Sequence, residues 1–276
     1  MINMRFAPAL ILFLLLAVSA HAEFQQSNLS VSVDVKPDGS AYVTETVRLF
    51  MDSGSPVIYD NAMTAYDLSS WRTKTKLDLR FHFNRDVVDI TDVSIRAQPR
   101  DNCYGCVRDV CTECYGTLII RYRLAPIANK TASGLFSMNR FKPRTTNYSL
   151  NSEAFSFESS GPGNSVLPDN TRLKLTLPPG AAVTSVNPMP EGTEGTSVSM
   201  PLYNVSSFSW SGRTTLSPFE LSFQNEEPLS VEVIGFFSSV RDGLLGVLYS
   251  QQGIAILFMS AVLIVSIVLL KRRQES

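Results

Sequence analysis

Histidine is almost missing from this sequence of 276 residues, which contains it only at His21 and His82. Many catalytic sites use histidine as a base or as a metal ligand, because its imidazole exchanges a proton near neutral pH. Two histidines so far apart in the chain disfavour chemistry of that kind. We therefore expect a protein that is not an enzyme.

An excess of charge of either sign is also lacking. The 24 lysines and arginines are balanced by 25 aspartates and glutamates, which gives a formal net charge of −1. Proteins that grip the phosphate backbone of nucleic acid usually carry a clear positive excess. We therefore expect no nucleic-acid partner.

Helical periodicity is scarce between residues 23 and 235, where apolar residues recur mainly at every second position. This period is typical of strands with one buried and one solvent-facing side. Residues 29–35 and 41–49 alternate in this way around the turn sequence Pro37-Asp38-Gly39-Ser40, which predicts a β-hairpin. Further strands are predicted at 76–84, 87–97, 117–124, 153–158, 172–177, 208–210, 219–224 and 229–234.

Many short strands joined by loops rich in Gly, Pro, Ser and Asn predict a mainly β fold, with one or two antiparallel β-sandwich (Ig-like) subdomains. A seam in the loop at 126–134 would give subdomains at 23–125 and 126–235. The aromatic-rich segment 58–72 is either a helix or an irregular crossover loop. Residues 236–252 have near-helical apolar spacing, which fits a stalk.

The chain begins with features of a secretory signal peptide at 1–22. One arginine, Arg5, precedes an apolar block at 10–18, and Ala20-His21-Ala22 supplies the small residues of a cleavage site. Cleavage after Ala22 is the prediction, and an uncleaved N-terminal anchor is the alternative.

A second apolar run at 253–270 is interrupted only by Ser260 and Ser266. At 1.5 Å per residue, such a helix nearly matches the hydrocarbon core of a bilayer, about 30 Å thick. The basic residues Lys271, Arg272 and Arg273 begin the tail 271–276. Because basic flanks stay in the cytoplasm, we expect a single-pass protein of the cell membrane, with its N-terminus outside and its C-terminus cytoplasmic. The helix would then contact membrane lipid.

Two segments carry a resemblance to other proteins. They are Val33-Asp34-Val35-Lys36-Pro37-Asp38-Gly39-Ser40-Ala41-Tyr42-Val43-Thr44-Glu45 and the later run Leu177-Pro178-Pro179-Gly180-Ala181. Together they resemble uncharacterised prokaryotic, archaeal-like, membrane-anchored β-sandwich ectodomains. The resemblance covers about a fifth of the chain and implies fold and location, but no activity.

All four cysteines fall within twelve residues, as Cys103, Cys106, Cys111 and Cys114. This C-x2-C-x4-C-x2-C pattern is symmetric about a turn near Arg108, so a hairpin would pair Cys103 with Cys114 and Cys106 with Cys111. Nested disulfides suit an oxidising exterior. In an ideal ladder the two pairs would occupy different faces, and a bulge at Gly105 would relieve that conflict.

Two alternatives remain open for the same four residues. A tetrathiolate zinc site needs four soft donors, which two C-x2-C elements supply, although the four-residue spacer is short. Thiol–disulfide exchange also uses C-x2-C pairs, and Arg108 is the nearest cation that could activate a thiolate.

Four N-glycosylation sequons begin at Asn28, Asn129, Asn147 and Asn204, of which Asn129 and Asn147 lie in loop-like sequence.

Taken together, the sequence predicts a membrane-anchored extracytoplasmic protein with a binding, structural or complex-assembly role and a protein partner. The alternative is a thiol–disulfide oxidoreductase or metal-binding protein that uses the cysteine cluster.

Overall fold

The β-hairpin expected near the N-terminus is present in the computed structural model of the chain. Strand β1 (Phe24–Val35) pairs antiparallel with β2 (Ala41–Asp52), and Val33 lies opposite Val43. The predicted signal segment at 1–22 lies outside the described residues. The structure describes residues 23–52, 54–108, 111–130, 133–142, 144–161, 164–191, 200–203, 205–216, 218–226 and 229–274.

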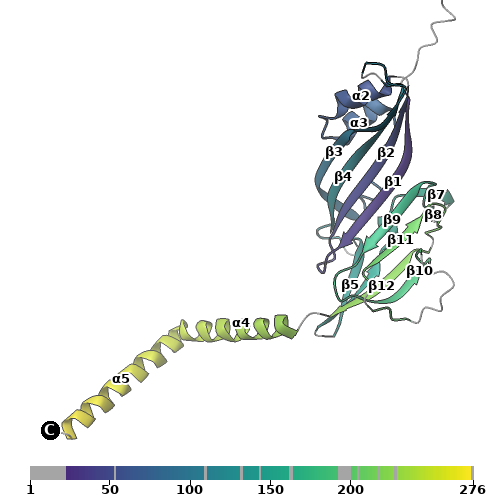
Figure 1. The fold of residues 1–276 in the computed structure, drawn as a ribbon. Helices are drawn as coiled ribbons and strands as arrows, with labels where there is room; N and C mark the ends of the chain where they lie inside the picture. Colours follow the sequence, from purple (N-terminus) through teal and green to yellow (C-terminus); the bar gives the residue numbers. More distant parts are fainter. Residues whose placement is uncertain are drawn as a thin grey trace, which may run out of the picture. The chain divides into compact units, whose positions relative to one another are not determined.

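The other elements follow in chain order and are labelled in Figure 1. They are α2 (Ser55–Ala62), α3 (Leu68–Thr75), β3 (Val88–Tyr104), β4 (Glu113–Pro126), β5 (Phe136–Lys142), β6 (Thr145–Leu150), η1 (Ser152–Ala154), β7 (Glu158–Gly161), β8 (Asn164–Val166), β9 (Thr171–Thr176), β10 (Ala182–Asn187), β11 (Ser207–Ser211), β12 (Glu220–Glu226), α4 (Leu229–Leu248) and α5 (Gln251–Gln274).

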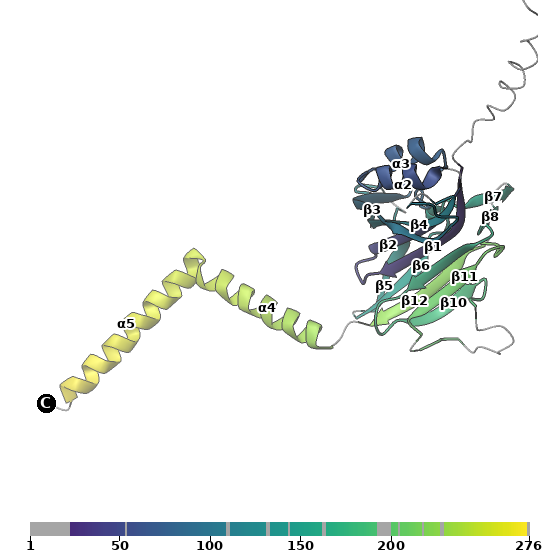
Figure 2. The same ribbon diagram turned by 45° about the horizontal axis from the view of Figure 1, so that its top comes forward.

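The strands form two main sheets, which confirms the mainly β class and is consistent with a sandwich (Figures 1 and 2). One sheet has six strands in the order β11-β9-β1-β2-β4-β3, and the other has four in the order β10-β12-β6-β5. The pairs in the six-stranded sheet are antiparallel except β1 with β9, which run parallel. Strands β7 and β8 form a separate two-stranded ribbon.

The six-stranded sheet combines strands from both ranges that we expected to be subdomains, 23–125 and 126–235. Strands β9 and β11 come from the later range, and β9 pairs directly with β1 from the earlier one. Residues 23–141 and 146–225 belong to one compact unit within the described chain, and 142–145 with 226–274 belong to another. The seam expected at 126–134 therefore does not separate the two sheets.

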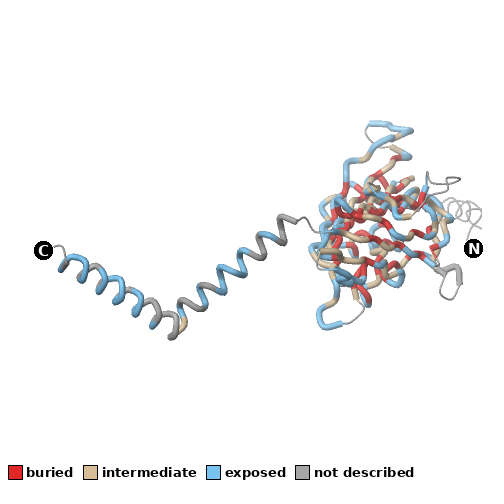
Figure 3. Tube along the Cα trace, turned by 90° about the horizontal axis from the view of Figure 1, so that it is seen from below, coloured by how far each residue is buried: buried red, intermediate tan, exposed pale blue. Residues whose placement is uncertain are grey.

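Buried residues gather in the β-rich unit, as the red segments of Figure 3 show. In β2, and in β1 from Leu29 onward, every second side chain is buried, which is the alternation expected of a sheet with one side on the core. Trp210 on β11 is buried against Phe219, at 5.1 Å between ring centroids. Both tryptophans, Trp71 and Trp210, serve packing in this core.

The segment 58–72 is mostly helical, divided between α2 and α3. Asp67 caps α3, since its side chain accepts a hydrogen bond from the backbone N–H of Ser70 at 2.8 Å. Hydrogen bonds from Ser69 and Ser70 lower the pKa of Asp67 to about 2. Lys76 ends the helix in the left-handed conformation, with φ 60°.

Tyr59 joins α2 to the six-stranded sheet and is fully buried. Its hydroxyl lies 2.7 Å from the carbonyl oxygen of Gln98 on β3, and 3.0 Å from both the carbonyl oxygen and the N–H of Thr117 on β4. Gly116 makes room for this contact, because a Cβ there would lie 2.6 Å from the tyrosine ring. Burial, foremost, raises the pKa of Tyr59 to about 12.

The strand predicted at 76–84 is wrong, although its apolar side chains do face the core. Leu79 and Phe83 are buried, but the backbone forms no continuous ladder: it bonds partly to side chains and partly to the backbone of residues 154–156. The carbonyl of Leu79 accepts from the Arg72 guanidinium, and the N–H of His82 donates to Glu45 at 3.0 Å. Only a single bridge, Phe83 with Phe155, has ladder geometry in this described segment.

The strand predicted at 153–158 is also wrong. Residues Ser152–Ala154 form a 3-10 turn that begins at Asn151, whose side chain accepts from the N–H of Glu153 at 3.2 Å. Phe155 and Phe157 remain buried after the turn. Their alternation therefore reflects core packing without a continuous strand.

The strand predicted at 229–234 is wrong as well, because these residues open helix α4. A helix satisfies its backbone hydrogen bonds within the segment, whereas a strand needs a neighbour. The helical spacing of residues 236–252 is confirmed, since they form most of α4 and the start of α5, and their role as a stalk stays a prediction. In the described part of the chain, no helix combines the length and apolar character that a membrane span requires. The span expected at 253–270 lies within α5 and stays a prediction.

We predict that Tyr59→Phe lowers the free energy of unfolding by about 2 kcal/mol at neutral pH, because Gln98 and Thr117 lose a buried hydrogen-bond partner. Between pH 10 and 12 the unfolded chain releases a tyrosine proton that folded Tyr59 keeps, so stability falls as pH rises. That part of the pH dependence should disappear in the variant. Urea unfolding at pH 7 to 12 measures both effects.

Tyr66→Phe is the matched control, since Tyr66 is 83% exposed. Equal stabilities for the two variants at pH 7 would show that the Tyr59 hydroxyl does not hold α2 to the sheet.

Candidate functional site

The cysteine cluster closes the hairpin formed by β3 and β4. Cys103 is bonded to Cys114 and Cys106 to Cys111, so all four cysteines of the chain are paired as disulfides. This is the nested pairing that the symmetric spacing predicts. Cys114 is fully buried, and Cys103 and Cys111 pack partly buried against the same core.

The backbone of the hairpin is irregular where the two pairs would otherwise face opposite sides. The β3–β4 register shifts between Gln98 and Asp101 and again between Asp101 and Tyr104. Gly105 has φ 61°, a conformation that favours glycine, and a Cβ there would lie 2.2 Å from the Thr112 hydroxyl. The backbone irregularity expected at Gly105 is therefore present. Gly105 adopts the left-handed conformation directly after β3, whose last residues contain the register shifts.

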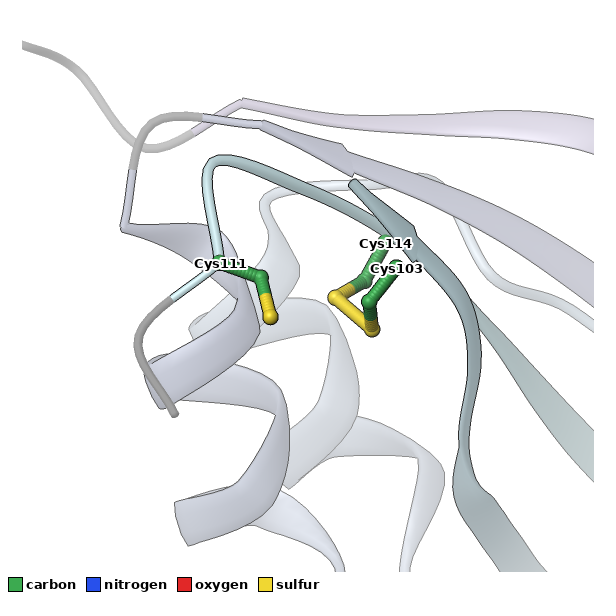
Figure 4. A group of neighbouring side chains, drawn as sticks. All are labelled: Cys103, Cys111 and Cys114. Atoms are coloured by element: carbon green, nitrogen blue, oxygen red, sulfur yellow. A yellow bond between two sulfur atoms is a disulfide. The ribbon is translucent and has the colours of Figure 1, made fainter. Parts of the chain in front are cut away.

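Three of the sulfur atoms lie close together. The Sγ atoms of Cys103, Cys111 and Cys114 are all within 4.8 Å of one another. Figure 4 shows the Cys111 side chain pointing toward the Cys103–Cys114 bridge, with helical turns beside it. The spacing is close enough for three ligands of one metal ion, provided that the sulfurs are thiolates.

A small cavity of about 400 Å³ lies beside the cluster, lined by Asp60, Met63, Pro99, Arg100, Cys103, Cys106 and Cys111. Arg100 crosses this region and pairs with Asp60 of α2 at 2.9 Å. Its guanidinium also lies 3.6 Å from the sulfur of Cys114. The ion pair and Tyr59 therefore hold α2 against the end of the β3–β4 hairpin that the disulfides close.

A second polar cluster lies in the core, around Glu45 on β2. The Glu45 side chain is 0% exposed, and its carboxylate faces His82 Nδ1 at 2.9 Å and accepts a hydrogen bond from the Tyr122 hydroxyl. His82, with a side chain 12% exposed, stacks on Phe157 at 5.4 Å between ring centroids. Burial and then the nearby Glu45 charge raise the pKa of Tyr122 well above its usual range.

The hydrogen bonds of this cluster satisfy the buried Glu45 carboxylate, and its 0% exposure leaves it out of reach of a substrate in solvent. A tyrosine with a raised pKa keeps its proton and serves as a donor, and the N–H of His82 supplies a second bond. Sequence reasoning missed Glu45, although a signal was available. Glu45 occupies an inward position between Val43 and Val47, in phase with the core.

The structure places three of the four sequons. Asn28 on β1 and Asn129 in the loop after β4 are exposed. Asn147 on β6 is half-buried, and its side-chain oxygen has no hydrogen-bond partner. Asn204 lies outside the described residues. None of the three described sequons lies on the part of the β3–β4 hairpin that carries the cysteines, where Cys103 belongs to β3 and Cys114 to β4.

Comparison with known proteins assigns the chain to no family. No protein-family model matches the chain, and no curated protein is significantly similar to it.

The two disulfides should contribute unequally to stability. Their cysteines are 11 and 5 residues apart, and the chain-entropy relation assigns about 3 kcal/mol to the longer loop and about 2 kcal/mol to the shorter. Replacing the buried Cys103–Cys114 pair by serines should therefore cost more than replacing Cys106–Cys111. Denaturant unfolding of the two double variants measures the difference. A greater loss from the Cys106–Cys111 variant would contradict this order.

Removing the Glu45 side chain should be strongly destabilising. Glu45→Ala leaves the His82 N–H and the Tyr122 hydroxyl without their acceptor inside the core, which we expect to cost about 3 kcal/mol. Thr46→Ala, on the next residue but facing outward, should stay within about 0.5 kcal/mol of the parent protein. Thermal unfolding compares the two. Similar losses in both variants would show that the cluster is not a core element.

Proposed function

We propose that this chain is a membrane-anchored extracytoplasmic β-sandwich protein whose role is to bind a partner or to assemble a complex. The observation that carries the proposal is the pair of nested disulfides at the β3–β4 hairpin. Disulfides persist in oxidising compartments and are rare in the reducing cytosol of most cells. An extracytoplasmic location accounts for them directly.

The features of helix α5 support the proposal of a membrane anchor near the C-terminus. It is continuous through residues 253–270, and its last turn carries Lys271, Arg272 and Arg273. Large apolar side chains along it are exposed, among them Phe258, Leu263 and Ile264. Lipid would cover such side chains, and the three cations would keep the tail on the cytoplasmic side. The side chains at 254, 256, 257, 261, 265, 268 and 269 lie outside the described residues.

The polar groups inside the sandwich support binding over catalysis. Glu45 is closed off from solvent, and its partners His82 and Tyr122 are engaged with it. A general base must reach the proton that it removes, and this carboxylate is enclosed by the core. We therefore assign the protein a non-catalytic role on its surface.

A second candidate function follows from the closeness of the Cys103, Cys111 and Cys114 sulfurs. In a reduced chain the four cysteines could hold a zinc ion, or a C-x2-C pair could exchange disulfides with a partner thiol. Thiol counting separates these cases. The disulfide assignment expects no free thiols before reduction and four after it. Four free thiols with bound zinc, or catalytic reduction of insulin, would favour the second candidate.

We expect the full chain to stay in the membrane pellet after alkaline carbonate extraction. Leu263→Arg with Ile264→Arg should shift it toward the soluble fraction, because each charge at the centre of a span costs about 2.5–3.5 kcal/mol. Leu263→Met is the matched control and should remain in the pellet. A membrane-impermeant label should react with lysines of the β-rich unit in intact cells. Release of the unmodified chain by carbonate would exclude the anchor.

A further inference from the structure

The six-stranded sheet has an outward side that differs from its core side. Side chains of β1, β2, β4 and β9 alternate between buried positions and exposed or half-buried positions. The strand registers bring the outward residues of all six strands into continuous rows. From β11 to β3, the first row is Ser209, Lys174, Ser32, Thr44, Arg121 and Ser94.

The second row lies two residues further along each strand. In the same strand order it is Ser211, Arg172, Ser30, Thr46, Ile119 and Arg96. We call these two rows together the basic face. It contains four cations and seven hydroxyl side chains, and neither row contains a carboxylate.

The cations of the basic face are largely unpaired. Lys174, Arg121 and Arg96 are exposed, and no carboxylate of the described residues forms an ion pair with any of the three. Arg172 has a loose partner, Glu191, at 3.9 Å, and the Glu191 carboxylate also accepts a hydrogen bond from the Ser209 hydroxyl at 3.2 Å. The β11 end of the face is therefore partly compensated, and the uncompensated charge lies on Lys174, Arg121 and Arg96. Positive charge without compensation on one side of a neutral protein attracts an anionic ligand.

The spacing of the cations fits an extended ligand that crosses the strands. Neighbouring strands lie about 4.8 Å apart, so Lys174 and Arg121, three strands apart, are separated by about 14 Å at the backbone. Arg172 and Arg96, four strands apart, are separated by about 19 Å. The charges are therefore distributed across the sheet, as a polymer with repeated negative groups requires.

Each end of the second row borders a hollow. Beside β3, a cavity of about 540 Å³ is lined by Ser94, Arg96, Ile119 and Arg121, among others. Beside β11, a cavity of about 650 Å³ includes Ser30, Arg172 and Ser211 in its lining. Both ends of the row therefore combine a concave surface with an arginine.

The chemistry of the basic face favours a polysaccharide over a protein partner. Protein interfaces are enriched in aromatic residues, methionine and arginine and depleted in lysine and serine. The rows share arginine with such interfaces, but seven of their twelve residues are serine or threonine and Ile119 is their single apolar residue. Serine and threonine hydroxyls both donate and accept, and arginine binds carboxylates with two parallel hydrogen bonds. Sugar hydroxyls and uronate groups match these two kinds of side chain.

We propose that the basic face binds an anionic polysaccharide, with its cations on the carboxylates and its hydroxyls on the sugar hydroxyls. Tyr42, on the neighbouring outward position of β2, is 52% exposed and offers a sugar ring an aromatic surface beside the Lys36 ammonium, which lies 5.3 Å from the ring centroid. This inference rests on the proposed surface-binding role and assigns it a ligand class.

The test measures binding of the full chain, purified in detergent micelles, to fluorescent polygalacturonate by anisotropy. We expect saturable binding that weakens as salt is raised, because screening reduces attraction between exposed charges. Neutral dextran should not bind. Arg96→Ser with Arg121→Ser should weaken binding of polygalacturonate at least 10-fold.

The matched control is Lys74→Ser with Arg85→Ser, which removes the same charge from α3 and from the segment before β3, outside both rows. It should bind as the parent protein does, and both double variants should keep the parent's thermal unfolding midpoint. The midpoint separates loss of the ligand site from loss of the fold.

Three outcomes would overturn the proposal: no binding of polygalacturonate, equal weakening by both double variants, or equally tight binding of polyglutamate, which would indicate charge attraction or an acidic protein partner. Carbonate extraction of membranes from the expressing cells, before detergent is added, tests the anchor separately. A chain that is anchored but does not bind polygalacturonate would therefore refute this inference alone.

Discussion

One-sided burial of the six-stranded sheet is the constraint on which the rest of the molecule depends. Because side chains alternate along each strand, a register that puts Val31, Val33 and Leu173 in the core also sends Ser30, Ser32 and Arg172 outward. A slip of one residue would exchange the two sets, so core packing holds the outward rows in place. The basic face is thus a consequence of the hydrophobic core, and its order is as well determined as the core itself.

Glu45 shows how strong that constraint is. The register carries this carboxylate into the core with Val43 and Val47, and the structure accommodates it with the His82 backbone and ring and with Tyr122. Within residues 76–84, the Leu79 carbonyl accepts from Arg72 and the His82 N–H donates to Glu45, so these two backbone groups bond to side chains and not to a neighbouring strand. The buried carboxylate therefore helps to hold this segment along the core.

The far end of the β3–β4 hairpin depends on a different set of bonds. There the strands reach the end of the sheet, where fewer apolar side chains are available to pack in the core. Tyr59 bonds to both strands, Arg100 pairs with Asp60, and the disulfides close the loop. Covalent and polar links are what such an irregular edge requires, since bulges interrupt its ladder. This arrangement leaves the cysteines in a supporting role in the proposed function.

The sequence by itself determined the features that depend on neighbours in the chain. The hairpin at 29–49, the strands 172–177 and 208–210 and the nested cysteine pairing follow from alternation, turn residues and symmetric spacing, which are local. Alternation could not distinguish a strand from other core-facing backbone, so 76–84 and 153–158 were mistaken for strands. Only the tertiary structure decided that β9 and β11 extend the sheet of β1, which brings Lys174 and Arg121 into one row. The reason is physical, because pairing between strands so distant in sequence is selected by the packing of the whole core.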